Sequence, residues 1–487
     1  MRRTPTDVLR RAVPVALAVA LLVAVFSTVI EHSGPRGVHP SAEFNAGGYD
    51  WTGVHRNRPG PQRLSIGVTH AQYSIDDWGN EGARVSARNV LAATATYQNQ
   101  HIFGWGTLNP EPSPGVFDWS SLDRRMKLIR DTGGTPVLTL CCAPDWMKGG
   151  RAGQTDWSRL HAAPTPEHYA DFAALAVAVA RRYPDVRHFL VWNEMKGFWD
   201  NAQNRWSYEA YTELYNAVYA ALEKAVPGVA VGGPYVVLDT WADRDAGGRP
   251  STLSGECGTV DQRSIDVLDY WLKNKIGADF VAVDGGSITR DAAVVSSTTV
   301  ASAVFGALTR WLRQRTSLPV WWAEFHVGQA TDDGQRRLVA SSVAALLHMV
   351  REGASVALVW QPELASDNPH EPSAPALWTS THNKAGGRPL ALAEAVARLQ
   401  DLLAGPADGD LVWWPLADLG VLAGPEAMLM VNTADHAVAT RVRGLSVRLA
   451  PYEVRYLPVP PGLPPVPPQW WTPAVDRCLR EAPQATP

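Results

Sequence analysis

Between residues 64 and 403 the sequence alternates short apolar runs with longer amphipathic stretches. The apolar runs are rich in β-branched residues and are short enough to be single strands. There are eight of them: 64–70, 101–107, 135–141, 187–193, 229–234, 279–284, 318–324 and 354–361. Eight nearly continuous apolar strands that alternate with helices predict a parallel sheet whose outer face is covered by helices.

The stretches between the runs have the length and periodicity of helices. In the clearest, 166–183, Pro166 stands at the first helical position and Pro184 ends the pattern. Apolar side chains recur at i, i+3, i+4 and i+7 from Tyr169 onward. Further helices are expected near 208–225, 261–276, 298–315, 333–351 and 389–403.

Eight such units over about 340 residues fit a (β/α)8 TIM barrel at 63–404, with long loops after several strands. An open, doubly wound sheet is the alternative. It would favour a glycine-rich phosphate loop after the first strand, where this chain has Gly67-Val68-Thr69-His70. We therefore expect the closed barrel.

The pattern changes after the barrel. Short strands separated by turn residues predict a small β-sandwich at 405–457. The remaining residues, 458–487, begin with seven prolines between Pro458 and Pro468 and are expected to form a polyproline-like extension.

The first 30 residues have the features of a membrane-targeting segment. Four arginines precede an apolar run from Ala12 to Ile30, which as a helix spans about 28 Å. The arginines favour a cytoplasmic N-terminus and an external body. We expect an uncleaved signal anchor at 1–30, with a cleaved export signal as the alternative, and a flexible linker at 31–62. The body would then be extracytoplasmic and anchored to the membrane, or secreted.

Export permits disulfides among the four cysteines, which are Cys141, Cys142, Cys257 and Cys478. Neighbouring cysteines rarely bond to each other, because a disulfide usually joins Cα atoms that are farther apart than those of adjacent residues. A bond from Cys257 to one of the pair and a set of free thiols both stay open. No C-x-x-C spacing or His/Cys cluster indicates a metal, so no metal and no cofactor is expected.

Composition narrows the class of partner. Lys and Arg number 44 and Asp and Glu 48, and the resulting net charge of −4 argues against nucleic acid, which would require a basic surplus. The chain also has 20 tryptophans, which favour a cleft lined by flat, half-polar rings, such as a sugar-binding cleft.

Two glutamates stand where the active site of such a barrel is built, at the carboxyl ends of strands. Glu194 ends the fourth run and Glu324 the seventh, on opposite sides of the rim. Two carboxylates that flank one pocket suit glycosidic cleavage, in which one acid protonates the leaving oxygen and one carboxylate attacks or activates water. Asp284 and Glu363, after strands six and eight, are competing acids.

Four stretches carry a further pattern in a fixed order. They are Trp105 to Pro112 followed by Gly115-Val116-Phe117-Asp118-Trp119, Ala143-Pro144-Asp145-Trp146, Trp192-Asn193-Glu194, and Glu324 on the seventh strand. They resemble the motifs of clan A glycoside hydrolases, most closely those of family 39, which includes β-xylosidases and α-L-iduronidases. The resemblance covers about residues 64–365.

The resemblance implies a retaining O-glycosidase that acts by double displacement on an extracytoplasmic carbohydrate. Glu324 would be the nucleophile, Glu194 the acid/base, and Asn193 the residue that holds the sugar's 2-hydroxyl. Other residues expected to bind substrate are Trp105, Trp146, Trp360 and His326. His326, two residues beyond Glu324, would contact the substrate or bond a loop carbonyl.

The sequence departs from the clan at strand six, where Val283-Asp284-Gly285-Gly286 replaces a His-x-Tyr-like ending and leaves the sugar open. The loop from Leu238 to Asp261 is expected to decide between attack at chain ends and within chains. Three alternatives to hydrolysis stay open: a non-catalytic glycan-binding barrel, a transglycosidase on the same scaffold, and a surface structural protein.

Overall fold

The computed structural model describes residues 51, 64–75, 77–243, 247–291, 297–328, 334–364, 375–404, 412–416, 418–442, 445–459 and 473–482. No helix in these ranges is long and apolar enough to cross a membrane. The expected signal anchor at 1–30 lies outside the described residues. So do the linker apart from Trp51, and residues 460–472 and 483–487 of the expected extension.

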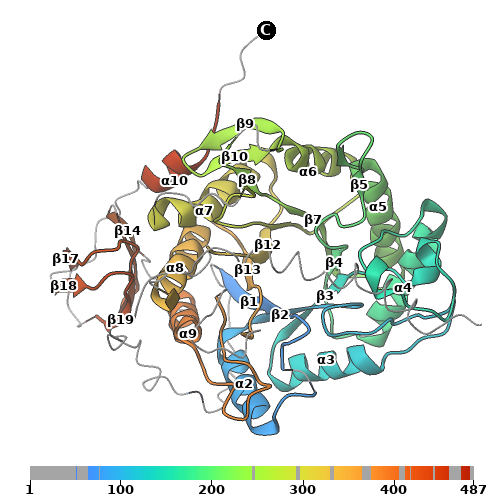
Figure 1. Ribbon diagram of the computed structural model, residues 1–487, viewed down its shortest axis with the longest axis horizontal. Helices are drawn as coiled ribbons and strands as arrows, with labels where there is room; N and C mark the ends of the chain where they lie inside the picture. Colours follow the sequence, from blue (N-terminus) through green and yellow to red (C-terminus); the bar gives the residue numbers. More distant parts are fainter. Residues whose placement is uncertain are drawn as a thin grey trace, which may run out of the picture. The chain divides into compact units, whose positions relative to one another are not determined.

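Eight parallel strands form a closed barrel in the order β1-β13-β12-β11-β7-β4-β3-β2 (Figure 1). Their bounds are β1 Ser65–Thr69, β2 Tyr97–His101, β3 Thr135–Leu140, β4 His188–Val191, β7 Ala230–Val237, β11 Phe280–Asp284, β12 Val320–Phe325 and β13 Val356–Val359. The barrel prediction is confirmed, and the open sheet is excluded because β1 pairs with both β2 and β13.

A helix follows each barrel strand and covers its outer face. The helices are α2 Glu81–Thr94, α3 Ser120–Asp131, α4 Tyr169–Arg182, α5 Tyr208–Ala225, α6 Gln262–Asn274, α7 Thr298–Arg315, α8 Gly334–Glu352 and α9 Ala391–Leu403. The bounds of α5 and α7 are those expected. The helix expected at 166–183 begins with a 3-10 turn, η5 Pro166–His168, before α4. Two further 3-10 turns are η3 Asp145–Lys148 and η4 Trp157–Arg159.

The second strand was wrongly placed at 101–107. The strand is β2, Tyr97–His101, and its buried side chains are polar. Asn99 fits the barrel interior because its amide donates to Thr69 Oγ1 at 3.1 Å and accepts from Thr139 Oγ1 at 2.9 Å. A search for apolar runs therefore passes over this strand and selects the turn that follows it, where Gly104 and Thr107 pair.

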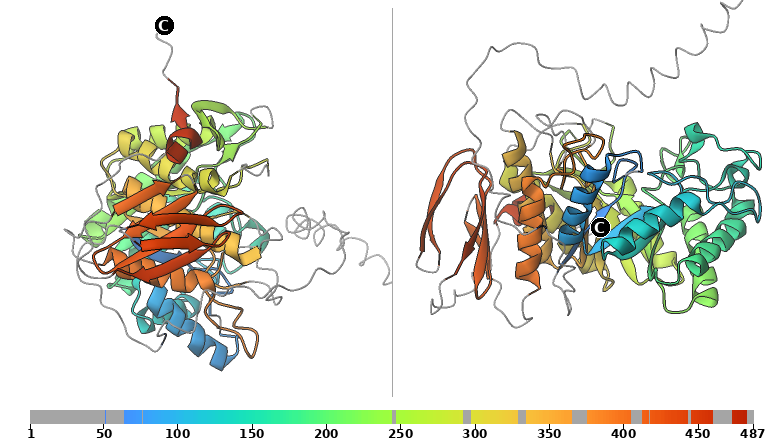
Figure 2. Two further views of the ribbon diagram at one scale, coloured as in Figure 1. Left: turned by 90° about the vertical axis from the view of Figure 1, so that its left-hand side faces the viewer. Right: turned by 90° about the horizontal axis from the view of Figure 1, so that it is seen from below.

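The predicted C-terminal sandwich is observed as two antiparallel sheets (Figure 2). One consists of β14 Val412–Leu416, β15 Leu419–Ala423, β16 Ala427–Asn432 and β19 Val454–Pro458, and the other of β17 Val438–Val442 and β18 Leu445–Leu449. Apolar side chains from both, including Val421, Met430 and Val447, form one buried cluster. Leu422, Leu429 and Val431 belong instead to the cluster that contains the barrel helices.

Part of the expected C-terminal extension is folded. Residues 473–482 contain a helix, α10 Pro473–Cys478, and a strand, β20 Arg480–Glu481. β20 joins a small sheet with β9 Pro250–Gly255, β10 Gly258–Asp261 and β8 Thr240–Trp241. The stretch from Leu238 to Asp261 thus supplies strands in its described part, and the C-terminal segment packs against it.

The two alternatives left open for the cysteines, a bond from Cys257 to one of the adjacent pair and a set of free thiols, are both wrong. Cys257 bonds Cys478, which is 221 residues away, because the pairing of β20 with β9 carries the C-terminal segment to it. Cys141 and Cys142 bond each other at the end of β3, with their Cα atoms 3.0 Å apart across a cis peptide bond. Both members of this second pair are fully buried.

Candidate active site

Glu194 lies in a tight turn directly after β4. Trp192 and Glu194 have positive φ angles of 69° and 49°, which non-glycine residues rarely adopt and which concentrate at functional sites. The buried indole of Trp192 donates to the carbonyl of Lys196 at 2.6 Å and closes the turn. Lys196 Nζ in turn lies 2.8 Å from Glu194 Oε2. The turn therefore fixes both the backbone and the carboxylate of Glu194.

Glu324 is turned toward the barrel mouth by an irregularity in β12. The register of β12 against β13 shifts between Trp322 and Phe325, and both of these side chains pack outward against Phe305 of α7. A shift of this kind re-aims a side chain next to a barrel rim. The carboxyl group of Glu324 is almost completely buried, with 4% of its side chain exposed.

A second irregularity brings Tyr235 to Glu324. In β7 the register against β11 passes from Pro234 to Val236, so that Tyr235 is the extra residue, with a φ of 55°. Its hydroxyl donates to Glu324 Oε1 at 2.6 Å. The fifth barrel strand thus supplies a tyrosine that contacts Glu324.

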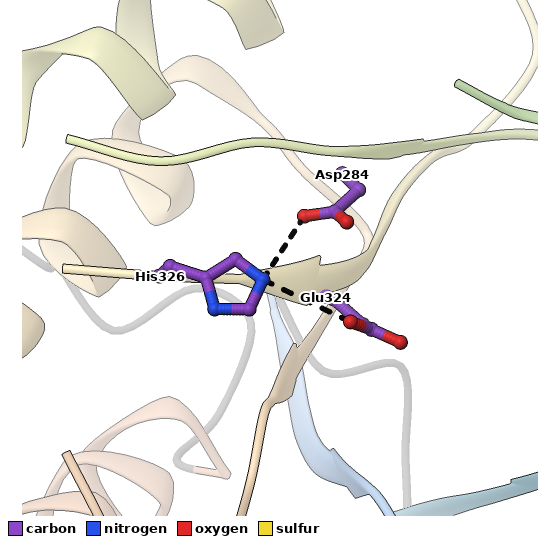
Figure 3. A group of neighbouring side chains, drawn as sticks. All are labelled: Asp284, Glu324 and His326. Atoms are coloured by element: carbon purple, nitrogen blue, oxygen red, sulfur yellow. Dashed lines mark ion pairs between the residues drawn. The ribbon is translucent and has the colours of Figure 1, made fainter. Parts of the chain in front are cut away.

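His326 joins Glu324 to Asp284, the last residue of β11 (Figure 3). Its Nε2 lies 3.4 Å from Asp284 Oδ1 and 3.8 Å from Glu324 Oε2. The imidazole therefore faces two buried carboxylates rather than a loop carbonyl. Its ring also meets the edge of Trp360 at a centroid distance of 5.0 Å.

The charges in this cluster act strongly on one another. Burial raises the pKa of Glu324 well above its ordinary value, and the charges of Asp284 and Glu194 raise it further. Burial also raises the pKa of Asp284, against the opposing effect of His326. Burial disfavours the protonated form of His326, but Asp284, Glu324 and Glu194 outweigh it and raise the pKa of this histidine to about 9. The charge of Glu194 therefore acts on the ionisation of both Glu324 and His326.

Asp284, Glu324 and His326 also form a group that could hold a cation. One ligand atom from each lies within 4.8 Å of the others, and in the described part of the chain this is the single group of three or more His, Cys, Asp or Glu side chains with such spacing. Two carboxylates and one imidazole suit several divalent metals. A metal bound there would occupy the carboxylate of Glu324, which a glycosidase would need as its free nucleophile.

Two of the three tryptophans expected to bind sugar are connected to the glutamates. Trp360 reaches Glu324 through His326, as described above. Trp105 stacks on His101 and His161, with centroid distances of 4.2 Å and 5.4 Å, and Lys196 Nζ lies 5.2 Å from the centre of its ring. Much of the Trp105 ring is therefore already covered by protein groups.

The third, Trp146, contacts the loops after β2 and β3. Its indole donates to the carbonyl of Glu111 at 3.0 Å, and its edge meets His168. These contacts do not bring it against either glutamate. Asn193 is fully buried beside the acid/base candidate, with Nδ2 3.5 Å from Glu194 Oε1.

Tyr235 and Lys196 are the site residues that sequence reasoning missed. Tyr235 lies just beyond the run expected at 229–234, because β7 is longer than that run, and its inward turn depends on an inserted residue that no periodicity shows. Lys196 stands two residues after Glu194, which was a usable indication of an ion pair. Asp284, considered only as a competing acid, is a full member of the cluster.

No protein-family model matches the sequence, and no curated protein matches it. The structure is similar to that of a family 39 glycoside hydrolase from Bacteroides cellulosilyticus, with a TM-score of 0.54 and 16% identity over 82% of this chain and 81% of that one. The chain has the fold of the family 39 glycoside hydrolases.

Two further structures support this statement about the fold. A monomeric β-xylosidase from Caulobacter crescentus has a TM-score of 0.51 and 16% identity, with 78% of this chain and 75% of that one covered. A GH39 enzyme from Xanthomonas axonopodis pv. citri has a TM-score of 0.50 and 19% identity, with 78% and 72% covered. Identities this low show a shared fold alone.

Proposed function

We propose that this chain is a retaining O-glycosidase in which Glu324 is the nucleophile and Glu194 the acid/base. The observation that carries the proposal is that both glutamates stand at the carboxyl end of the barrel and act on each other's charge. Glu324 is buried and held by Tyr235, and Glu194 is held by a strained turn. Their strands, β12 and β4, are the ones on which the clan A resemblance places the same two roles. The similarity in fold is consistent with the proposal.

In the first step Glu324 attacks the anomeric carbon. Because Oε1 accepts the hydrogen bond from Tyr235, we assign the new bond to Oε2, which lies 3.8 Å from His326 Nε2. The bond from the anomeric carbon to the leaving oxygen breaks, and Glu194 transfers its proton to that oxygen. The product of this step is a glycosyl ester on Glu324.

In the second step water replaces the protein. Glu194, now a carboxylate, removes a proton from water as the water oxygen attacks the anomeric carbon, and the ester bond to Glu324 breaks. Glu194 regains its proton and Glu324 its charge. Two inversions leave the anomeric configuration unchanged.

The proposed substrate is a carbohydrate outside the cytoplasm. The apolar segment at 12–30 with its preceding arginines supports export, and two disulfides within the described residues are typical of an oxidising compartment. We propose that the barrel is anchored at the membrane by residues 1–30, or released if that segment is cleaved.

The first test is hydrolysis of a panel of aryl glycosides with activated leaving groups, including β-xylosides and β-glucosides. Wild-type protein is expected to release the aryl alcohol from at least one member of the panel, and Glu324→Gln to lose turnover by several orders of magnitude. Glu223→Gln, on the exposed side of α5, is the matched control and is expected to keep full activity. Full activity of Glu324→Gln would overturn the proposal.

A further inference from the structure

Three exposed aromatic rings lie together on the rim of the barrel, outside the site described above. Trp78 and Tyr73 belong to the loop after β1, and His382 to the loop after β13. Trp78 is 69% exposed and Tyr73 37%. Their rings meet His382 edge-on, at centroid distances of 6.1 Å and 6.4 Å. The ring planes are inclined to that of His382 by 65° for Trp78 and 71° for Tyr73, so neither ring is stacked on it. We call these three residues the rim platform.

The platform is held in place by a buried carboxylate that the proposed reaction does not use. Glu363, 1% exposed, accepts hydrogen bonds from the Ile75 amide at 2.7 Å and from the Trp378 indole at 3.0 Å. Its other oxygen accepts from the amide and the hydroxyl of Thr381, both at 2.6 Å. Ile75 lies between Tyr73 and Trp78, and Thr381 precedes His382. One carboxylate therefore fixes the two loops that carry the exposed rings.

The platform is continuous with the candidate active site along the chain. Glu363 follows Trp360 by three residues, and Trp360 contacts His326 beside the nucleophile candidate. β1 and β13 are neighbours in the barrel, and both loops leave its carboxyl end, where Glu194 and Glu324 lie. The platform and Trp360 are thus carried by neighbouring strands at the same end of the barrel.

We infer that the rim platform is a second sugar-binding site, at which a polysaccharide chain rests while another part of it occupies the site of Glu194 and Glu324. Exposed Trp and Tyr rings present an apolar surface with a polar edge, which suits the alternating C–H and O–H groups of a sugar ring. A fixed platform loses little conformational freedom when the chain binds. That the same polysaccharide also enters the site of Glu194 and Glu324 rests on the proposed function. Binding at the platform does not, because it requires no catalysis.

The test compares a long substrate with a short one in the double variant Tyr73→Ala/Trp78→Ala. On inactive Glu324→Gln protein, retardation in gels that contain soluble xylan, mixed-linkage β-glucan or galactan measures binding alone. The double variant is expected to weaken retardation by at least fivefold in the polymer that retards the parent protein. In the active protein it is expected to raise KM for that polymer by a similar factor and to leave kcat/KM for an aryl glycoside unchanged.

A second exposed tryptophan supplies the control. Trp157, 50% exposed, lies in η4 after β3, and Trp157→Ala is expected to leave retardation unchanged. Equal losses in the two variants, or no loss in the double variant, would overturn the platform. Retention on phosphatidylcholine vesicles that depends on Trp78, without glycan retardation, would also overturn it and assign the rings to a lipid surface. Glycan retardation that depends on Trp78 in a chain that cleaves no aryl glycoside would keep the platform and reject the proposed hydrolysis.

Discussion

Glu324 is surrounded by groups that oppose one another in setting its ionisation. Burial and the negative charges of Asp284 and Glu194 favour its neutral form, while His326 and the hydrogen bond from Tyr235 favour the carboxylate. Attack on an anomeric carbon requires the carboxylate. Asp284 and His326, which are drawn beside Glu324 in Figure 3, therefore help to decide at which pH the proposed reaction can start.

Substitution of Asp284 and of His326 is expected to shift the pH dependence in opposite directions. Asp284→Asn removes a negative charge beside Glu324, lowers the pKa of Glu324, and moves the acid limb of kcat/KM to lower pH. His326→Gln removes a positive charge, because a pKa of about 9 keeps this histidine protonated at the acid limb, and moves the limb to higher pH. A neighbouring charge at this distance shifts a pKa by roughly one to three units.

The measurement is kcat/KM for an aryl glycoside between pH 4 and pH 9. The acid limb of this profile reports the pKa of the essential carboxylate in the free protein. Shifts of the same sign in the two variants, or no shift in either, would show that the cluster does not control the ionisation of Glu324.

The hydrogen bond from Tyr235 is expected to contribute directly to turnover. Tyr235→Phe removes a 2.6 Å bond to a charged oxygen. Such bonds contribute about 1.5–3 kcal/mol, which corresponds to a loss of roughly tenfold to hundredfold in rate. Steady-state kcat and thermal unfolding are measured together, and a variant with unchanged kcat would contradict a role for this tyrosine in holding the nucleophile.

At this scale the sequence was informative about the two glutamates and less so about their partners. Glu194 and Glu324 could be placed because each follows an apolar run at a strand end. Tyr235 could not, because its position depends on one inserted residue in β7. The pairing of His326 with Asp284 depends on the spacing between β11 and β12, which no single-strand pattern contains.

Among the elements, periodicity placed apolar strands and amphipathic helices well. It failed for β2, whose buried side chains are polar. Asn99 bonds Thr69 and Thr139 inside the barrel, and Gln98 donates to Thr132 Oγ1 at the end of α3. It also failed for residues 473–482, because the proline-rich stretch before them gave no indication of the short helix and strand that follow.

The bond from Cys257 to Cys478 is expected to hold the C-terminal helix and strand against the barrel. The double variant Cys257→Ala/Cys478→Ala is expected to lose about 2–4 kcal/mol of stability and to unfold several degrees lower. Differential scanning calorimetry measures the Tm. The control is Asp476→Asn, in the same helix as Cys478, which removes an ion pair with Arg310 of α7 but keeps the disulfide. It is expected to change the Tm little. An unchanged Tm in the cysteine variant would show that α10 and β20 dock without the bond.

For the whole molecule, the alternation of eight apolar runs with helical stretches was sufficient to predict the closed barrel. The topology depends on the number and order of the strands and helices, so an error in the bounds of a single strand such as β2 did not alter it. The disulfide pairing could not be predicted in the same way, because it depends on the docking of a segment 221 residues from its partner.

The first 30 residues are expected to attach the chain to a membrane with the barrel outside. The full-length protein is expected to sediment with membranes and to resist extraction by high salt, whereas a chain that lacks residues 1–30 is expected to stay in the supernatant. Protease added to intact cells or spheroplasts should digest the barrel of the full-length protein. Protection of the barrel would contradict the proposed orientation, and a mature N-terminus beyond residue 30 would identify the cleaved form.

Rescue by azide tests the central assignment of Glu324 and Glu194 most directly. With an aryl glycoside that has a good leaving group, Glu194→Ala still forms the glycosyl ester, and azide is expected to restore turnover and give a glycosyl azide that retains the substrate's anomeric configuration. Glu324→Ala cannot form the ester, so azide is expected to give either no product or a glycosyl azide of inverted configuration. Proton NMR of the products distinguishes the two. Inverted azide from Glu194→Ala, or full activity in both variants without azide, would contradict the account.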